Sequence, residues 1–250
     1  MFDEWMAALE ARHLADLSFS EVSRALRALS STYVERRGRI AEGAALSGAG
    51  KRAAFALFYG PLHFLLVREI VRSLNATRGV TRIVDVGCGT GASGAAWARR
   101  WANASEDAAA PAVHGLDLHP WALQEAAWTY RQFGLRGRTS RTNVAAQPLP
   151  RERSAWLCAF ALNELAPPAR DGLIAQLLER HKAGAPVLIV EPLAGPVAPW
   201  WAACRRQIEG AGGRADEWRI QVELPAIVLK LDRAAGLDHR AVTGRSFWLP

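Results

Sequence analysis

The stretch RIVDVGCGTGASG, residues 82–94, decides how the rest of the chain is interpreted. Its first half places β-branched residues around a single acid, Asp85, as is typical of a buried strand. Glycines then follow at every second position, at Gly87, Gly89 and Gly91. A glycine-rich turn between a strand and a helix lets a ligand approach the backbone closely. We therefore expect a ligand at this turn.

The spacing of the glycines restricts the kind of ligand. A phosphate-binding loop of the Walker type ends in Gly-Lys-Ser/Thr, and no lysine lies near this stretch. The dinucleotide pattern G-x-G-x-x-G is satisfied by Gly89, Gly91 and Gly94, but glycines at every second position produce it readily by chance. The spacing excludes phosphoryl transfer and leaves a dinucleotide open beside a ligand without phosphate.

From residue 81 onward, apolar strand patterns alternate with helical patterns. Alternation of this kind is typical of an α/β fold with a doubly wound, mostly parallel sheet. We expect strands at 81–87, 112–118, 138–144, 154–165 and 185–192, helices at 92–102, 119–134, 167–184 and 198–210, and one or two closing strands within 239–250.

Residues 1–74 are expected to be helical. Ser18 and Glu21 form a capping box at the start of one amphipathic helix, and Pro61 is expected to start or kink an apolar helix within 55–74. The chain is therefore divided into a helical lid or substrate subdomain, 1–75, and a cofactor-binding domain, 76–250.

The charge of the chain permits an anionic partner. The formal net charge is +7 and the pI about 10.0, which favours RNA among possible partners. Lysine occurs only at three positions, so arginine carries nearly all the positive charge, and a compositional bias toward arginine explains that choice equally well.

Neither a membrane nor a metal is expected as a partner. The most apolar segment, 53–67, is too short and too interrupted to span a bilayer, and the N-terminus does not resemble a signal peptide. Cys88, Cys158 and Cys204 lie far apart and lack metal-ligand spacing. We expect a soluble cytoplasmic protein.

The order acid-x-Gly-x-Gly-x-Gly, carried by Asp85, Gly87, Gly89 and Gly91, resembles the first motif of the class I S-adenosylmethionine-dependent methyltransferases. The resemblance implies S-adenosyl-L-methionine as the cofactor and an enzyme that transfers its methyl group. It also implies that the glycines and Cys88 between them lie against the amino-acid end of the cofactor. The acid would help to hold the ammonium group of that end, directly or through water.

The following strands add to this resemblance. Asp117 ends the second strand, where a carboxylate accepts hydrogen bonds from ribose hydroxyls, and Pro120 opens the next helix. Leu118 is expected to flank the adenine. Asn143, after the third strand, stands where the family often has an acid that contacts the adenine amino group.

The reacting groups are expected beyond the carboxyl ends of the strands. Asn163 and Glu164 follow the fourth strand and are the predicted catalytic residues; Glu191 ends the fifth. His119, and His63 together with Tyr59, are candidate bases.

A narrower resemblance is to the mitochondrial small-ribosomal-subunit methyltransferase-like family, which has bacterial members. It rests on YVERR, FYGPLHFLLV, VDVGCGTG, FALNEL and VLIVEP, spread over roughly residues 30–195. It implies a ribosomal or RNA-linked role. Members often carry a cysteine cluster for iron–sulfur binding, which this chain lacks, so no metal is carried over.

Three functions follow from these patterns. We expect methylation of RNA, ribosomal RNA above all, or of a small molecule enclosed by the helical lid. The third is a catalytically idle cofactor-binding protein that assists ribosome assembly.

Overall fold

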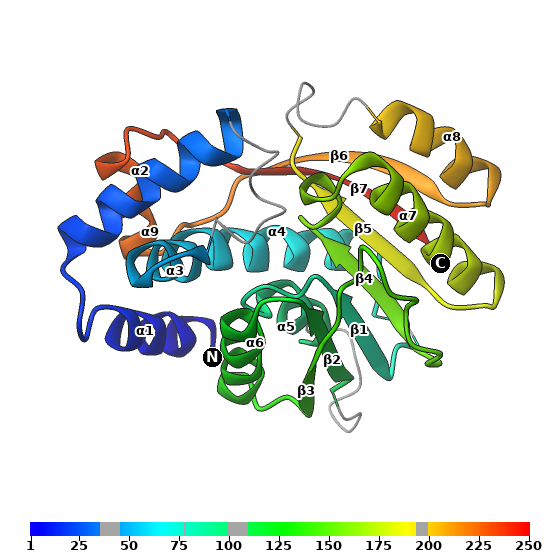
Figure 1. Cartoon of the computed structure of the whole chain (residues 1–250), viewed down its shortest axis with the longest axis horizontal. Helices are drawn as coiled ribbons and strands as arrows, with labels where there is room; N and C mark the ends of the chain where they lie inside the picture. Colours follow the sequence, from blue (N-terminus) through cyan, green and yellow to red (C-terminus); the bar gives the residue numbers. More distant parts are fainter. Residues whose placement is uncertain (36–45, 78, 100–109, 194–199) are drawn as a thin grey trace.

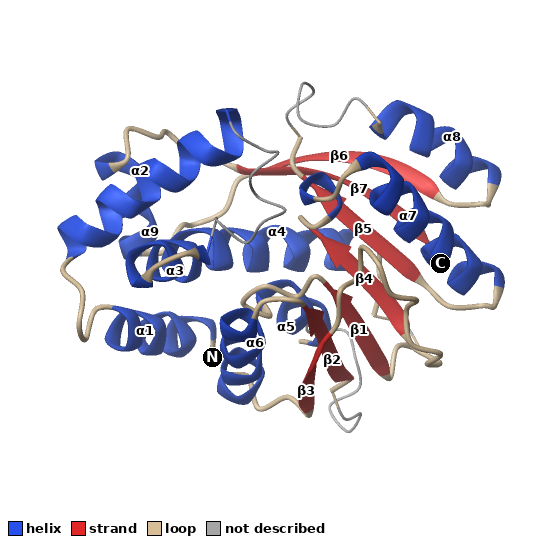
Figure 2. Ribbon diagram, viewed as in Figure 1, coloured by secondary structure: helices blue, strands red, loops and turns tan. Residues whose placement is uncertain are grey.

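The strands of the chain form one seven-stranded sheet in the order β3-β2-β1-β4-β5-β7-β6 (Figures 1 and 2). The computed structural model describes residues 1–35, 46–77, 79–99, 110–193 and 200–250. β7 runs antiparallel to both of its neighbours, and the other pairs are parallel. The strands are β1 Arg82–Val86, β2 Ala112–Asp117, β3 Gly137–Arg141, β4 Ala155–Ala159, β5 Val187–Glu191, β6 Arg214–Ile220 and β7 Val242–Leu249.

Helices cover both faces of this sheet. Side chains alternate along each strand, so that Ile83 of β1 points into one layer and Val84 into the other. The described helices are α1 Phe2–His13, α2 Phe19–Glu35, α3 Ala49–Ala54, α4 Gly60–Ser73, α5 Ala92–Ala98, α6 Pro120–Gln132, α7 Pro167–Lys182, α8 Trp201–Gly210 and α9 Ala226–Ala234, with a π-helical turn, η3 Phe55–Tyr59, and a 3-10 turn, η4 Leu162–Glu164.

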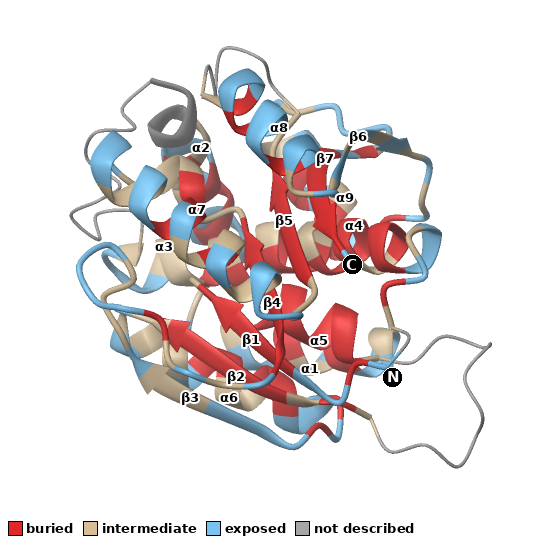
Figure 3. Ribbon diagram, turned by 90° about the vertical axis from the view of Figure 1, so that its right-hand side faces the viewer, coloured by how far each residue is buried: buried red, intermediate tan, exposed pale blue. Residues whose placement is uncertain are grey.

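The central strands are buried on both sides (Figure 3). Residues of α4, α5 and α6 pack against one face of the sheet, and residues of α7 and α8 pack against the other. The predicted α/β fold with a doubly wound, mostly parallel sheet is confirmed. The carboxyl ends of β1 and β4 lie side by side, and their connections pass to opposite faces. Ligands bind at such a point in open α/β sheets.

Residues 49–73 form one unbroken helical segment from α3 through η3 to α4. The π-helical turn directly precedes Pro61, which lies in the first turn of α4. Proline lacks the N–H that would continue the α-helical hydrogen bonds, and a wider turn accommodates that gap. The segment is long and apolar enough to cross a membrane, but 72% of its apolar window is buried inside the protein. It is a core helix in this structure.

The helical region shares its hydrophobic core with the sheet. The fully buried Trp5 of α1 contacts Phe64 of α4 and Phe133 after α6, with ring centroids 5.6 and 5.3 Å apart. The buried carboxylate of Glu125 in α6 accepts hydrogen bonds from Arg12 Nε at 3.3 Å and lies 2.8 Å from His13 Nε2. These contacts link the helical residues before 75 to the sheet domain after it. The division of the chain at residue 75 stays a prediction.

Residues 239–250 hold one strand, β7, which agrees with the predicted one or two closing strands. Its edge partner β6 lies earlier, with α9 between them, and was not predicted. β6 is an edge strand with four charged residues, Arg214, Asp216, Glu217 and Arg219, and such a polar edge strand is difficult to recognise from the sequence. The capping box is confirmed, since Ser18 N donates to Glu21 Oε2 at 2.8 Å. The end of the helix predicted at 92–102 and the two arginines of YVERR, residues 36 and 37, fall outside the described residues.

Trp5→Ala tests whether α1 belongs to the common core. Removing this buried ring should lower the free energy of unfolding by about 3–5 kcal/mol, because a large cavity remains between three helices. Urea unfolding measures the change. Phe19→Ala, at a ring that is 37% exposed, is the control and should change stability by less than about 1 kcal/mol. A similarly small effect of Trp5→Ala would show that α1 is not part of the core.

Candidate functional site

The turn between β1 and α5, residues 87–91, has a backbone that side chains would obstruct. Gly87 and Gly91 have φ angles of +70° and +75°, which favour glycine. A Cβ atom on Gly87 would lie 2.7 Å from Ala161 Cβ, and one on Gly91 would lie 2.8 Å from Ala126 Cα. Both distances are too short for any side chain, so we refer to residues 87–91 as the glycine loop and regard its bare backbone as a requirement of the fold.

Asp85 precedes the glycine loop and holds the start of α5, the helix that follows the loop. Its buried carboxylate accepts a hydrogen bond from Gly94 N at 3.1 Å and one from the Tyr130 hydroxyl at 3.4 Å. Burial raises the pKa of Asp85 to about 7, although the hydrogen bonds from Gly94 and Tyr130 oppose the shift. Its contacts in this structure are with the protein, and its predicted contact with an ammonium group stays a prediction.

Asp117 holds the glycine loop from the side. Its Oδ2 accepts a hydrogen bond from Gly89 N at 3.0 Å, and its Oδ1 accepts one from His119 N at 2.8 Å. An ionised carboxylate has about four acceptor positions, so two stay available for a ligand. The next side chain, Leu118, is 48% exposed, whereas most other large apolar side chains of the described residues are covered. A fixed carboxylate beside an exposed apolar side chain suits a ribose beside a flat base.

Cys88 takes part mainly through its backbone. Its N–H and that of Gly87 both donate to the Leu116 carbonyl oxygen, at 3.0 and 2.8 Å. The thiol is buried against Gly115, where a Cβ atom would lie 2.8 Å from Sγ. Burial raises the pKa of the Cys88 thiol well above its usual range, so the side chain is a packed neutral group.

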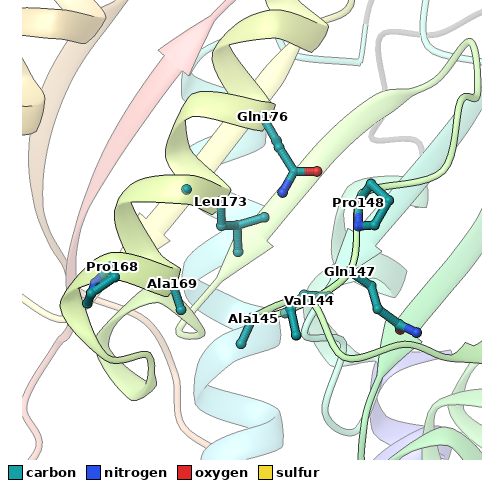
Figure 4. A pocket seen from close by; sticks show the side chains of 10 residues that line it. Val144, Ala145, Gln147, Pro148, Pro168, Ala169, Leu173 and Gln176 are labelled. Carbon is teal, nitrogen blue, oxygen red and sulfur yellow. The ribbon is translucent and has the colours of Figure 1, made fainter.

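Asn143 shapes the loop after β3. Its Oδ1 accepts a hydrogen bond from Ala145 N at 3.1 Å, and its backbone N–H donates to Gln147 Oε1 at 2.8 Å. A hollow of about 370 Å³ lies beside this loop and against α7 (Figure 4). Leu173 and Gln176 line it from the helix, and Gln176 Oε1 accepts a hydrogen bond from Leu149 N at 2.7 Å. The contact of Asn143 with adenine stays a prediction.

Asn163 and Glu164 lie in the short turn η4 after β4. The Asn163 amide donates to Glu191 Oε2, and its Oδ1 accepts a hydrogen bond from Trp200 Nε1 at 3.2 Å. Glu191 is fully buried at the end of β5, and burial raises its pKa to about 8 although Leu162 N donates to it at 2.8 Å. Both polar groups of the Asn163 side chain are thus engaged by the protein, which suits a positioning role. The catalytic roles of Asn163 and Glu164 stay predictions.

An aromatic wall, defined as Phe55, Tyr59, His63 and Phe160, lies over the glycine loop. Phe55 Cε1 is 3.6 Å from the position that a Cβ atom on Gly89 would take. The rings of His63 and Phe160 are stacked, 3.7 Å apart and 10° from parallel. The Phe55 ring lies 5.8 Å from that of Tyr59 and 6.1 Å from that of His63, edge-on to the latter. Residues from the helical segment 49–73 and from the end of β4 therefore meet above the glycine loop.

The candidate bases differ in their surroundings. His119 caps α6, because its Nδ1 accepts a hydrogen bond from Trp121 N at 3.2 Å. Tyr59 is largely buried, and burial raises its pKa to about 12. Burial among the aromatic rings lowers the pKa of His63 to about 3, which keeps its imidazole neutral at physiological pH. Of the two histidines, His119 caps a helix and His63 does not.

The structure brings the predicted cofactor residues together. Asp117 holds Gly89 in the glycine loop and Asp85 holds Gly94 just after it, with Asn143 after β3 and Asn163 after β4 on either side. Sequence analysis missed Tyr130 and Phe160. The spacing of Ala122, Ala126 and Tyr130 on one helix face was the available signal for the first.

Comparisons with known proteins agree with this geometry. Residues 83–184 match the sequence family described as "Methyltransferase domain". No curated protein sequence matches the chain. The structure is similar to magnesium protoporphyrin IX methyltransferase from Synechocystis PCC 6803, solved with bound SAH, at 14% identity over 88% of this chain and 97% of that one, with a TM-score of 0.50.

Two further solved structures have lower TM-scores. A SAM-dependent methyltransferase from Aquifex aeolicus has a TM-score of 0.46 at 17% identity, over 76% of this chain and 93% of that one. The methyltransferase domain of the bacterial protein CtHen1 has a TM-score of 0.49 at 13% identity, over 76% and 98%. The predicted class I methyltransferase fold is confirmed, and the match of residues 83–184 to the methyltransferase-domain family supports the prediction of an enzyme that uses S-adenosylmethionine.

Proposed function

We propose that this protein transfers a methyl group from S-adenosylmethionine to a small organic molecule that contains a planar ring. The observation that carries this proposal is the aromatic wall above the glycine loop, whose Phe55 ring lies within van der Waals reach of the Gly89 position. A flat apolar surface beside a cofactor loop suits an acceptor with an aromatic face.

The residues of the site fit the cofactor. The Asp117 carboxylate, oriented by Gly89 N and His119 N, would accept hydrogen bonds from the two ribose hydroxyls. Leu118 would cover one face of the adenine, and the glycine loop would admit the amino-acid end. Asp85 lies beneath that end and would offset the positive charge of its ammonium group.

The chain's contribution to catalysis is alignment. The cofactor supplies a methyl group on a sulfonium sulfur, a reactive donor. The protein holds the nucleophile in line with that group and excludes water. Asn163 is held by Glu191 and Trp200, and the aromatic wall is held by the core helix 49–73, so both sides of the acceptor position are rigid.

RNA is the second candidate acceptor. It is favoured by the net charge of +7 and by the resemblance to the ribosomal methyltransferase-like family. The same resemblance favours the third function, a catalytically idle assembly factor. A nucleobase turned out of its strand also stacks on aromatic side chains. The described side chains of the aromatic wall include no cation, however, and a phosphate backbone requires cations. The rings of the aromatic wall therefore suit the face of a small planar acceptor better than they suit a phosphate backbone.

The deciding experiment supplies the purified protein and a cell extract with S-adenosylmethionine carrying a labelled methyl group. RNA, protein and small-molecule fractions are then counted. Label in small molecules supports the proposal. Label confined to RNA overturns it in favour of the second candidate, and tight cofactor binding without label in any fraction supports the idle assembly factor.

Asp117→Ala tests the placement of the ribose. Losing charge-assisted hydrogen bonds to the ligand, together with the support of Gly89, should weaken cofactor binding by roughly 10- to 100-fold. Isothermal titration with S-adenosylhomocysteine measures the affinity. Asp171→Ala removes an exposed carboxylate on α7 and should leave the affinity unchanged. Equal affinities of both variants would place the ribose elsewhere.

The pKa of Asp85 predicts how stability changes with pH. Its pKa is raised from 3.8 to about 7 by burial, so between these values the folded protein binds a proton that the unfolded chain has lost. The contribution of Asp85 to the free energy of unfolding should thus fall as pH rises from about 4 to 7, by on the order of a few kcal/mol.

Asp85→Asn carries no titratable group and should lose this part of the pH dependence. Urea unfolding of both proteins at pH 4.5 and pH 7.5 gives the comparison: relative to the wild type, the variant should be more stable at the higher pH than at the lower. A constant difference between them would show that Asp85 is ionised throughout.

A further inference from the structure

The aromatic wall has two polar side chains, Tyr59 and His63. The ring nitrogens of His63 make no hydrogen bond with the described residues, whereas its ring contacts the neighbouring aromatic rings. It lies in the first turn of α4 and is only partly buried. The side chains around it, Phe55, Tyr59 and Phe160, contact it through their rings. A polar group left without a partner in an apolar setting costs stability, unless a ligand or water satisfies it.

We propose that His63 binds the nucleophilic hydroxyl or amino group of the methyl acceptor, while the stacked pair of His63 and Phe160 provides the surface for the acceptor's ring. The inference rests on the proposed function and names the acceptor class more closely: a planar ring that bears a hydroxyl or an amine.

The position of His63 places it near the reacting atoms. Its neighbour Phe55 lies against Gly89 of the glycine loop, and Gly60, one turn before it, approaches Thr90 so closely that a Cβ atom there would lie 3.3 Å from Thr90 Oγ1. The helix that carries His63 therefore crosses directly over the loop that would hold the sulfonium end of the cofactor.

The chemistry of the imidazole suits this role. A neutral imidazole has one donor and one acceptor nitrogen. Its acceptor nitrogen can therefore accept a hydrogen bond from the O–H or N–H of the methyl acceptor. The lone pair of the nucleophilic atom then stays directed at the methyl group. Burial keeps His63 neutral, so it does not repel the positively charged sulfonium.

The backbone at Phe160 supports a functional interpretation of the stacked pair. Phe160 has a φ angle of +59°, a conformation that is costly for a bulky residue. Its N–H donates to the Val190 carbonyl oxygen at 2.8 Å, so the sheet fixes this conformation. In this conformation the ring stacks on His63, and one side of Phe160 packs against the core while the residue stays only partly buried.

Binding of two simple probes tests the proposal on the full-length protein. 2-Naphthol and naphthalene share a planar ring system and differ in one hydroxyl group. Each is titrated in the presence of S-adenosylhomocysteine, and the affinity is measured together with the imidazole nitrogen signals of protein labelled with ¹⁵N-histidine. We expect 2-naphthol to bind about tenfold more tightly than naphthalene and to shift the His63 signals, as one hydrogen bond predicts.

His63→Phe keeps a ring stacked on Phe160 but removes both nitrogens. It should bind 2-naphthol about tenfold more weakly than the wild type while its affinity for naphthalene and for S-adenosylhomocysteine is unchanged. His63→Gln restores a donor and an acceptor and should recover part of the preference for 2-naphthol. His181→Phe, at the far end of α7 where Nε2 lies 3.2 Å from the Ala211 carbonyl oxygen, is the control and should behave as the wild type.

The outcomes separate this inference from the proposed function. Equal affinity of the wild type and His63→Phe for 2-naphthol overturns the inference, even when label from S-adenosylmethionine enters small molecules. Failure of the wild type to bind either probe also overturns it. When label enters RNA alone but 2-naphthol binding still depends on His63, the proposed function fails and the binding role of His63 stands.

Discussion

The hydrogen bond from Gly89 N to the Asp117 carboxylate is the interaction on which the site depends, because the glycine loop has almost no side chains with which to hold itself in place. Its surroundings are Asp117 from β2, which bonds Gly89, Asp85 from β1, which bonds Gly94 just after the loop, and Phe55 from the helical segment above. These residues come from separate parts of the sequence; the parallel sheet brings the two acids to one edge, and the helical segment adds Phe55. A backbone held in this way is bare enough for a ligand to approach and rigid enough to align it.

The helical segment 49–73 serves both stability and the site. Its α4 part packs on α5 in the sheet's helical layer, and its π-helical turn presents Phe55 and Tyr59 over the glycine loop. A π-helical turn changes the direction in which the following side chains point, and such turns are frequent at functional sites. Because this segment is part of the core, the aromatic wall is fixed by packing. A site built on a buried element has less freedom to move than one built on a surface loop.

The sequence predicted the residues around the glycine loop better than it predicted the aromatic wall. Asp85 and Asp117 were recognisable because each lies at or next to the carboxyl end of an apolar strand, so local patterns alone place both at one sheet edge. The stacking of His63 on Phe160 joins residues almost a hundred positions apart and depends on a positive φ angle at a phenylalanine, for which no local pattern exists. β6 was missed for a related reason: its neighbour in the sheet, β7, is antiparallel and follows it after a helix, so neither spacing nor hydrophobicity marks it.

Two buried acids show how the fold balances stability against an ordered site. Asp85 lies one residue before the end of β1 and Glu191 ends β5. Their side chains point to opposite faces of the sheet, and burial raises the pKa of each, to about 7 and about 8. Each carboxyl group accepts a hydrogen bond from a backbone N–H in the first turn of a helical element: Gly94 N in α5, which follows β1, and Leu162 N in η4, which follows β4. An apolar residue would avoid the cost of desolvation but would leave those N–H groups unsatisfied and the turns unsupported. The acids lie where the chain turns sharply, after β1 and after β4, and the surrounding core, anchored by residues such as Trp5 and Trp97, compensates for their cost.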